Sequence, residues 1–286
     1  MMTTSTKPLH PNMHITFIGG GNMGRALISG LLQHGFLAQQ IQVVDAYAPT
    51  REKLHTDFQL TTLESAADVL LETNAEHILV LAVKPQDFKT AALSLRPILK
   101  KNSAALVLSI AAGIRLAEMS RWLDHALCIR AMPNTPALIG QGITALFATS
   151  AVDTLGRERA GLICNAVGQS LWLSEEGLMD AVTALSGSGP AYVFAFLEAL
   201  QAGGEKLGLS SAIARQLAYA TLSGATALAQ QSSDSPATLR AKVTSKGGTT
   251  AAALAVLENQ QWQAILEKAL EAAAKRGKEL GDELSQ

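Results

Sequence analysis

The sequence predicts an α/β fold in which a doubly wound sheet is followed by an all-α C-terminal part. Three observations predict it: a glycine-rich turn between an apolar run and a helical pattern, an alternation of strand-like and helical patterns up to about residue 174, and the loss of strand patterns beyond that point. Strands that alternate with helices form right-handed βαβ crossovers, which give a parallel sheet with helices on both faces.

The glycine-rich turn is the most informative of these patterns. The apolar run 14–18 leads into Gly-Gly-Gly-Asn-Met-Gly at 19–24, and a helical pattern follows over 25–32. In a Gly-x-Gly-x-x-Gly turn, the first glycine allows the tight turn, the second lets backbone approach a pyrophosphate, and the third lets the helix pack closely on the strand. The helix N-terminus offers N–H groups and a positive dipole end to the phosphates. This order of elements predicts a Rossmann-type dinucleotide site and disfavours a glycine turn without a ligand.

Short apolar runs predict the strands of the first part. Two of them, 78–83 and 105–110, are apolar on both faces, which is typical of central parallel strands covered by helices on each side. The full set of expected strands is 14–18, 41–44, 59–61, 77–83, 104–110, 126–130, 142–147 and 170–173.

Beyond this part only helical patterns remain. Ser210 and Ser211 are candidate N-caps, and so is Ser235, with Pro236 at the first helical position. The expected helices are 175–185, 191–207, 210–230, 235–243, 249–258 and 262–280. The expected domains are a disordered tail at 1–13, a dinucleotide-binding domain at 14–174, and a helical substrate and dimerisation domain at 175–286.

The helices of the second part carry broad apolar faces. The leucines on these faces are Leu197, Leu200, Leu207, Leu217, Leu222 and Leu228. Such faces either fill an intrachain core or bury part of their surface against a second subunit. We expect a homodimer through the C-terminal helices, with the intrachain core as the alternative.

Composition bounds the class of protein. The chain has 286 residues, of which 48% are hydrophobic and 16% charged, and its net charge is −1; this predicts a large core and no basic face for nucleic acid. The apolar runs are too short to span a bilayer, and residues 1–13 lack the apolar region of a signal peptide. Cys128 and Cys164 are isolated and indicate buried thiols of a reducing compartment. We expect a soluble, cytoplasmic protein that binds neither nucleic acid nor a membrane.

Few residues of the second part can transfer protons. All six histidines lie at or before His125, and no His, Cys or Asp cluster has metal-ligand spacing, so no metal site is expected. The helical half offers hydroxyls, glycines and backbone amides in two loops before helices, at 186–192 and 244–250. In the first, Ser188 or Gly189 is the expected cap. Such a loop is either a natural carboxylate trap or an ordinary capped connection between helices.

The first part adds residues at the carboxyl ends of its strands, where open α/β sheets bind ligands. Asp45 ends the second strand at about the distance expected for an acid that holds a ribose hydroxyl. Residues 82–85 follow the fourth strand, and Asn134 follows the sixth in a loop with two prolines, where it could face a nicotinamide. Each has a plainer alternative, since Lys84 could be a solvated lysine and Asn134 a turn residue.

Together these motifs resemble pyrroline-5-carboxylate reductase, the enzyme of the last step of proline biosynthesis. The resemblance covers nearly the whole chain. It rests on Phe-Ile-Gly-Gly-Gly-Asn-Met-Gly at 17–24, Ala-Val-Lys-Pro at 82–85, Ser-Ile-Ala-Ala-Gly at 109–113, Arg-Ala-Met-Pro-Asn-Thr-Pro at 130–136, Ser-Gly-Ser-Gly-Pro-Ala-Tyr at 186–192 and Gly-Gly-Thr-Thr at 247–250. It implies a Rossmann domain, a helical domain that interlocks with a partner subunit, and often a decamer of five dimers.

The resemblance also implies the site residues. The catalytic residue would be Thr250, hydrogen-bonded to the substrate's ring nitrogen. The expected substrate contacts are Ser188, Ser245, Gly247, Gly248, Thr249 and Thr250. The expected cofactor contacts are Ile18, Gly19, Gly21, Asn22, Met23, Gly24, Asp45, Ala82, Val83, Lys84, Pro85, Ala111, Ala112 and Asn134.

The implied reaction is hydride transfer from NADPH or NADH to the C=N carbon of a cyclic imine carboxylate, which gives L-proline. A protonated imine accepts hydride without a strong general acid, which fits a helical half without histidine. The cofactor preference is open, because Asp45 would repel a 2′-phosphate whereas Arg51 and Lys53 could offset it. Lys246 stands where the family usually has proline, and it either adds charge for the carboxylate or points to water.

Two other functions stay open on the sequence. A β-hydroxyacid dehydrogenase shares the layout but needs a catalytic helix lysine, for which Lys206 is a candidate without a matching motif. A nucleotide-sensing protein would bind the cofactor without turnover. The Gly-Gly-Thr-Thr loop argues against a sensor, because a sensor needs no carboxylate trap.

Overall fold

A computed structural model describes residues 10, 12–71 and 76–285 of the chain. These residues form two units, one made of the residues up to Gly187 together with those from Ala273 on, the other of Ser188–Ala272. Of the expected tail at 1–13, residues 1–9 and 11 lie outside the described residues, and Met13 is the first residue of a strand.

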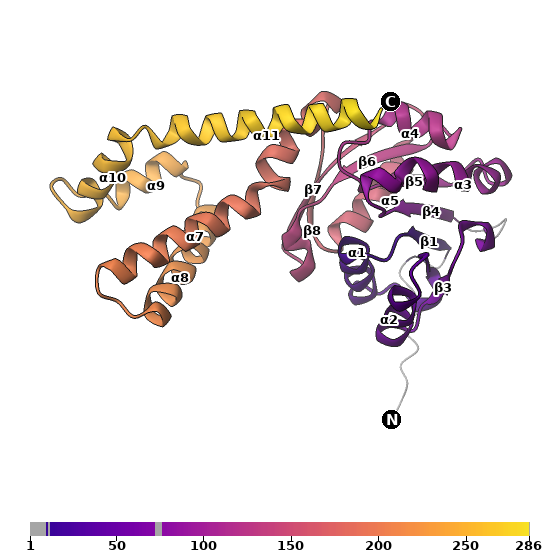
Figure 1. The fold of residues 1–286 in the computed structure, drawn as a ribbon, viewed down its shortest axis with the longest axis horizontal. Helices are drawn as coiled ribbons and strands as arrows, with labels where there is room; N and C mark the ends of the chain where they lie inside the picture. Colours follow the sequence, from indigo (N-terminus) through magenta and orange to yellow (C-terminus); the bar gives the residue numbers. More distant parts are fainter. Residues whose placement is uncertain (1–9, 11, 72–75, 286) are drawn as a thin grey trace. The chain divides into compact units, whose positions relative to one another are not determined.

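The first unit is built on an eight-stranded sheet in the order β3-β2-β1-β4-β5-β6-β7-β8 (Figure 1). Its strands are β1 Met13–Ile18, β2 Ile41–Val44, β3 Thr61–Leu63, β4 Glu76–Leu81, β5 Leu106–Ser109, β6 Cys128–Met132, β7 Gly142–Ala148 and β8 Gly168–Trp172. The order runs outward from β1 in one direction and from β4 in the other, as in a doubly wound sheet. The predicted fold class is confirmed.

One strand pair departs from the expected parallel arrangement. β6 and β7 pair antiparallel, with Arg130 opposite Phe147. The connection between them carries a short 3-10 helix, η4 Thr135–Ile139, and no α-helix. A parallel crossover needs a dozen or more residues, usually with a helix, so this short connection returns the chain antiparallel.

Helices cover both faces of the sheet. The α-helices of the first unit are α1 Asn22–Gln33, α2 Ala48–Phe58, α3 Phe88–Lys101, α4 Leu116–Leu123, α5 Thr154–Asn165 and α6 Met179–Val182. The shorter turns are η1 Ala38–Gln40, η2 Ala66–Asp68, η3 Pro85–Asp87, η5 Glu176–Leu178 and the π-helical turn η6 Thr183–Gly187.

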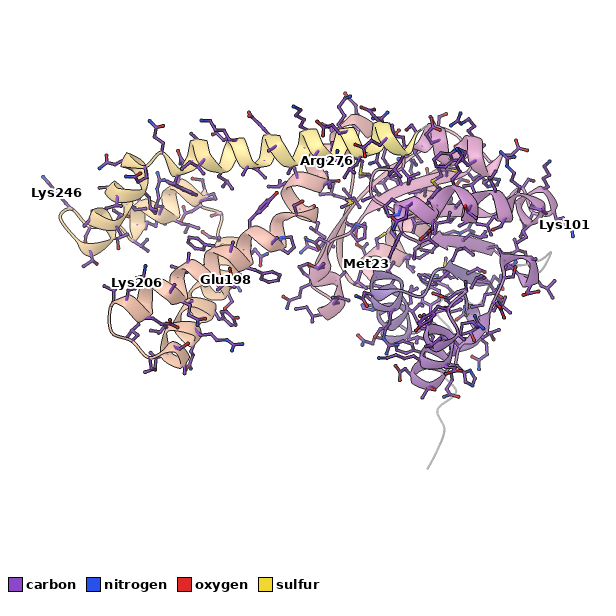
Figure 2. All side chains as sticks on the ribbon, in the orientation of Figure 1. Met23, Lys101, Glu198, Lys206, Lys246 and Arg276 are labelled. Carbon is purple, nitrogen blue, oxygen red and sulfur yellow. The ribbon has the colours of Figure 1, made fainter. Side chains whose placement is uncertain are left out.

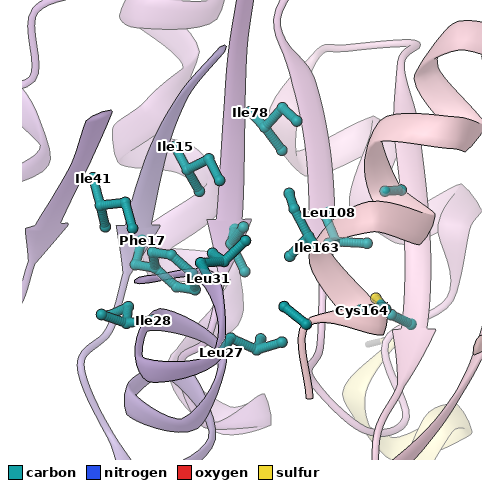
Figure 3. Packing of buried hydrophobic residues seen from close by; sticks show 14 of the residues in the cluster. Ile15, Phe17, Leu27, Ile28, Leu31, Ile41, Ile78, Leu108, Ile163 and Cys164 are labelled. Carbon is teal, nitrogen blue, oxygen red and sulfur yellow. The ribbon is translucent and has the colours of Figure 1, made fainter. Parts of the chain in front are cut away.

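Alternation along the strands divides the core into two clusters. Ile15 and Phe17 of β1 pack against α1 and α5 on one face, and Figure 3 shows Phe17 beside Leu31. Leu79 and Leu81 of β4 pack with α3 and α4 on the other. Full burial of one such side chain stabilises the fold by about 1.5–3 kcal/mol. Because helices cover both faces of the sheet, successive residues of these strands are buried on opposite faces, and the strands are apolar on both.

Two expected elements are wrong in detail. The strand expected at 59–61 is β3 at Thr61–Leu63, because Gln59 ends α2 in a left-handed conformation with φ 56° and cannot start a strand. The single helix expected at 175–185 is divided into η5, α6 and η6. There the Ser186 hydroxyl donates to the Val182 carbonyl at 3.0 Å, a side-chain bond of the kind that bends helices.

The second unit is helical throughout. Its helices are α7 Gly189–Lys206, α8 Ser211–Gln231, α9 Pro236–Lys242, α10 Thr249–Asn259 and α11 Trp262–Leu284, of which the turns from Ala273 on belong to the first unit. Two predicted N-caps are confirmed: the hydroxyls of Ser210 and Ser235 accept hydrogen bonds from Ile213 N at 3.4 Å and Thr238 N at 3.2 Å.

This unit has almost no core within the single chain. Among its described residues, Ala214 and Ala218 are the buried hydrophobic ones. Large apolar side chains stay exposed, among them Phe194 at 60%, Leu217 at 53% and Leu228 at 61%. A helical unit with so few buried apolar side chains and so many exposed ones indicates a surface for protein association.

Across the described part of the chain, no helix is both long and apolar enough to cross a membrane.

Candidate functional site

The glycine turn leaves β1 at the point where the strand order reverses. Ile18 is in register with Leu81 of β4, and Leu81 with Ser109 of β5, so the three strands end at the same edge of the sheet. The order reverses between β1 and β4, and ligands of open α/β sheets bind at such a switch point.

The three glycines of the motif differ in what a Cβ atom at each position would meet. Gly19 has φ +99°, and a Cβ there would lie 2.7 Å from the Ala82 carbonyl oxygen. A Cβ on Gly24 would lie 2.8 Å from the Gly19 carbonyl oxygen, so only glycine lets α1 start this close to the turn. At Gly21 no heavy atom of the described residues comes within 4 Å of the Cβ position. The open side at Gly21 is the side from which a phosphate could approach the backbone.

The N-terminus of α1 completes a cradle for an anion. Gly21 takes the N-cap position and has no side chain to cap the helix. The first-turn N–H groups, which include those of Asn22 and Met23, lack intrahelical partners and point out of the helix end. Together with the helix dipole they attract a phosphate, so the residues present fit a dinucleotide pyrophosphate.

Asp45 fixes the turn to the end of β2. Its carboxylate accepts a hydrogen bond from Gly20 N at 2.8 Å and another from Tyr47 N at 2.9 Å. Nearby, the Arg51 guanidinium donates to the carbonyls of Asp45 at 2.8 Å and Ala46 at 3.0 Å. The arginine therefore hydrogen-bonds to the main chain of the loop that follows β2.

Two more predicted segments lie at the same edge. Ala82 N donates to Ile18 O at 2.8 Å, and residues 83–85 continue from it into η3, with Lys84 exposed. In the β5–α4 loop, Ser109 Oγ accepts a hydrogen bond from Ala111 N at 3.2 Å, and Ala112 is half-buried. The structure thus brings the glycine turn, Asp45 and both loops to one edge of one unit.

The β5–α4 loop is held by contacts that the sequence did not predict. Leu116 N donates to Glu176 Oε1 at 2.8 Å, and the same oxygen pairs with the buried Arg130 at 3.1 Å. Beyond this pair, Gly113 has φ +77° and packs against Gly281 of α11. The sequence places Gly281 just beyond the helix expected at 262–280, and no local pattern indicates its partner 168 positions away.

The last turns of α11 add an ion pair and an apolar contact to this packing. Arg115 pairs with Asp282, and Leu284 packs against the α3–α4 core cluster and Gly113. These contacts connect the C-terminal helix to the loop that carries Ala111 and Ala112.

Asn134 is engaged with the protein. Its amide nitrogen donates to Ser186 O at 3.2 Å, and its amide oxygen accepts from Ile143 N at 2.9 Å. These bonds fix the β6–β7 connection to β7 and to the end of η6. A contact with a nicotinamide stays a prediction and would use the second amide hydrogen.

The predicted substrate residues lie in the second unit. Gly248 N donates to Ser245 O at 3.0 Å and Gly247 has φ +72°, as in a type II turn. Gly248 is the N-cap of α10, so the first-turn N–H groups of Thr249 and Thr250 point out of the helix end. Ser188 takes the corresponding N-cap position of α7.

Lys246 occupies the second position of this turn. It is exposed, and Figure 2 shows its side chain projecting outward from the loop. Proline is favoured at that position of type II turns because its φ is already fixed there. This explains physically why a proline and this lysine can alternate at one position.

In the described ranges, no group of three or more His, Cys, Asp or Glu side chains could hold a metal ion.

Comparison with known proteins gives consistent matches along the chain. Residues 14–113 match the family described as NADP oxidoreductase, coenzyme F420-dependent, and residues 176–280 match the pyrroline-5-carboxylate reductase dimerisation family. Pyrroline-5-carboxylate reductase of Pseudomonas aeruginosa is 43% identical, with 95% of this chain and 98% of that protein covered. The enzyme of Pisum sativum is 38% identical, with 92% and 94% covered.

Solved structures agree. The structure of a pyrroline-5-carboxylate reductase from Coxiella burnetii is similar with a TM-score of 0.88 at 39% identity, covering 94% of this chain and 98% of that one. A Plasmodium falciparum pyrroline carboxylate reductase with NADP bound has a TM-score of 0.82 at 28% identity, covering 95% and 99%.

Proposed function

Because the chain belongs to the pyrroline-5-carboxylate reductase family, we propose that it reduces 1-pyrroline-5-carboxylate to L-proline with NADH or NADPH, the last step of proline biosynthesis. One structural observation carries the proposal. The turn at Gly19, Gly21 and Gly24 forms an open anion cradle at the switch point of the sheet, in a chain similar to reductases over nearly its whole length.

The first unit binds and orients the cofactor in this proposal. The turn N–H groups and the α1 N-terminus hold the pyrophosphate, and Asp45 accepts hydrogen bonds from the ribose. Residues 82–85 and the loop with Ala111 and Ala112 line the nicotinamide side and keep water away. Hydride for the C=N carbon is the chemistry that the nicotinamide supplies when it is bound.

The Gly247–Gly248 turn and α10 bind the substrate in this proposal. The free N–H groups at the start of α10 bind the carboxylate, which the positive end of the helix also attracts. The Thr250 hydroxyl hydrogen-bonds the imine nitrogen. An imine nitrogen is far more basic than a ketone oxygen, so no strong general acid is required.

Replacement of Thr250 tests this assignment. Thr250→Ala should lower the rate of imine-dependent cofactor oxidation by roughly ten- to a hundred-fold, the loss of one charge-assisted contact in the transition state. Thr250→Ser should restore most of the rate, because it keeps the hydroxyl. Thr249→Ala is the matched control, since only its backbone N–H is assigned a role. An unchanged turnover in Thr250→Ala would remove this threonine from the site.

The second unit serves association between chains. The match to a dimerisation family and the exposed apolar side chains of α7, α8, α10 and α11 indicate that the chain oligomerises. We propose a homodimer through these helices, with a decamer of five dimers as the larger assembly. Light scattering coupled to gel filtration would measure the particle mass, and a monomer would refute this. Free, buried cysteines also fit the reducing conditions of the cytoplasm, where we expect the enzyme to act.

The two alternative functions are not favoured. A β-hydroxyacid dehydrogenase would use Lys206 as its catalytic lysine, but Lys206 lies exposed in the last turn of α7. A sensor would bind the cofactor without oxidising it in the presence of the imine, which the same assay detects.

A further inference from the structure

The carboxylate of Asp45 is held in one orientation at the end of β2. Its two oxygens accept hydrogen bonds from two backbone N–H groups, Gly20 at 2.8 Å and Tyr47 at 2.9 Å. Both donors belong to the loops at the edge where the cofactor cradle lies. Because each carboxylate oxygen has two lone pairs, both can still accept a hydrogen bond from a ribose hydroxyl.

The nearest arginine is already occupied by the protein. Arg51 donates to two main-chain carbonyls of the β2–α2 loop and lies 3.5 Å from Glu64. Its side chain is only 19% exposed. A guanidinium that satisfies carbonyl oxygens and faces a carboxylate would have to give up these bonds to bind a phosphate.

The arginine of the first turn of α1 is occupied as well. Arg25 forms an ion pair with Asp57, and its guanidinium carbon lies 4.7 Å from the centre of the Phe58 ring. Both partners belong to α2, so Arg25 connects the two helices that flank the glycine turn. Lys53 on α2 is exposed and is the cation whose reach must be tested directly.

We infer that this chain selects NADH over NADPH and that the Asp45 carboxylate sets the selection. A 2′-hydroxyl donates to this fixed acceptor, whereas a 2′-phosphate would place negative charge against it and can donate no hydrogen bond in its ionised form. The inference rests on the proposed function for the identity of the cofactor, but it concerns binding and can be measured without any substrate.

Binding titrations test the inference. The folded protein is titrated with NADH and with NADPH, and nicotinamide fluorescence gives both dissociation constants. The wild type should bind NADH at least about tenfold more tightly, the scale expected of one like-charge contact at a partly exposed site. Equal binding, or tighter binding of NADPH, would overturn the inference.

Variants assign the effect to its residue. Asp45→Asn keeps the size and removes the charge, and it should shift the NADPH-to-NADH affinity ratio by about tenfold toward NADPH. Glu52→Gln, which removes an exposed charge from α2, is the matched control and should leave the ratio within about twofold. An unchanged ratio in Asp45→Asn would exclude Asp45 as the determinant.

A second pair of variants keeps the test valid if Asp45→Asn folds poorly. Arg51→Ala and Lys53→Ala should leave the affinity ratio unchanged, even where both affinities fall together. A loss of about tenfold in NADPH affinity alone, in either variant, would show that a cation recognises the 2′-phosphate and would overturn the inference. Preferential NADH binding without imine reduction would refute the proposed function and leave the inference standing.

Discussion

The packing of α11 against the β5–α4 loop predicts a graded response at Gly281. A Cβ built there lies 3.2 Å from the Gly113 carbonyl oxygen and 3.5 Å from the Arg115 guanidinium. An alanine requires a shift of a few tenths of an ångström. A leucine adds three more carbon atoms to this contact and must push the end of α11 away from the loop.

The magnitudes predict different changes in the free energy of unfolding for the two substitutions. Replacing a helical glycine by alanine contributes roughly 0.5–1 kcal/mol, which offsets the slight crowding, so Gly281→Ala should be close to neutral. Gly281→Leu should lose most of the contact of the half-buried Leu284, about 1 kcal/mol, and the exposed Arg115–Asp282 pair, under about 1 kcal/mol. After the gain from replacing glycine, a net loss of about 1 kcal/mol is expected.

The same displacement should weaken cofactor binding. Gly113 belongs to the loop that carries Ala111 and Ala112. If NADH binds only when this loop is in its wild-type position, binding must offset the lost contacts. An offset of about 1 kcal/mol corresponds to roughly fivefold weaker binding of NADH. Nicotinamide fluorescence gives the dissociation constant and the urea midpoint gives the stability. Gly277→Ala is the control, because its Cβ would meet Asp180 at an ordinary 3.6 Å. Wild-type affinity in Gly281→Leu would refute the claim that α11 positions this loop.

Three further outcomes are expected. Lys246→Pro should raise the free energy of unfolding by about 0.4–1 kcal/mol, measured by urea denaturation, and leave the substrate KM unchanged, because the lysine side chain points outward from the loop; a KM that rises several-fold would assign its charge to carboxylate binding. Burial raises the pKa of Cys128 to about 11 and that of Cys164 to about 12, so at pH 8 at most about one thiol in a thousand is ionised. A thiol reagent should therefore label neither cysteine until urea unfolds the chain, and fast labelling of the folded protein would contradict this. Burial also lowers the pKa of His125 below its ordinary 6.5, and the hydrogen bond to the Ala105 carbonyl offsets only part of this shift. Below about pH 6.5 the unfolded chain therefore binds more protons than the folded chain, and the free energy of unfolding falls. His125→Gln should reduce the drop in urea midpoint between about pH 7.5 and 5.5, and an unchanged drop would contradict this.

The parts of the fold that depend on neighbouring residues could be predicted from the sequence. β1, the glycine turn and α1 follow one another directly, and the steric reasons for Gly19 and Gly24 act over a few residues and one adjacent strand. The helices of the second unit also agree within a few residues, because Ser210 and Ser235 cap their helices locally. Local capping and periodicity sufficed for these elements.

Features that depend on distant contacts could not be predicted. The antiparallel direction of β7 follows from the length of a connection whose short 3-10 helix carried no clear pattern. The sequence offers Asn134 as a nicotinamide contact or a turn residue, but its amide hydrogen bonds to Ser186 and Ile143 depend on the folded arrangement and could not be predicted. The packing of Gly281 on Gly113 joins residues far apart along the chain, and no periodicity records such a pair.

Reduction of a cyclic imine by a nicotinamide cofactor can be followed in one absorbance assay. The purified protein is mixed with 1-pyrroline-5-carboxylate and with NADH or NADPH, and loss of the reduced cofactor is followed. We expect oxidation that depends on the imine, faster with NADH than with NADPH, and formation of L-proline in equal amount. Folded protein that binds the cofactor but oxidises neither form in the presence of the imine would contradict it.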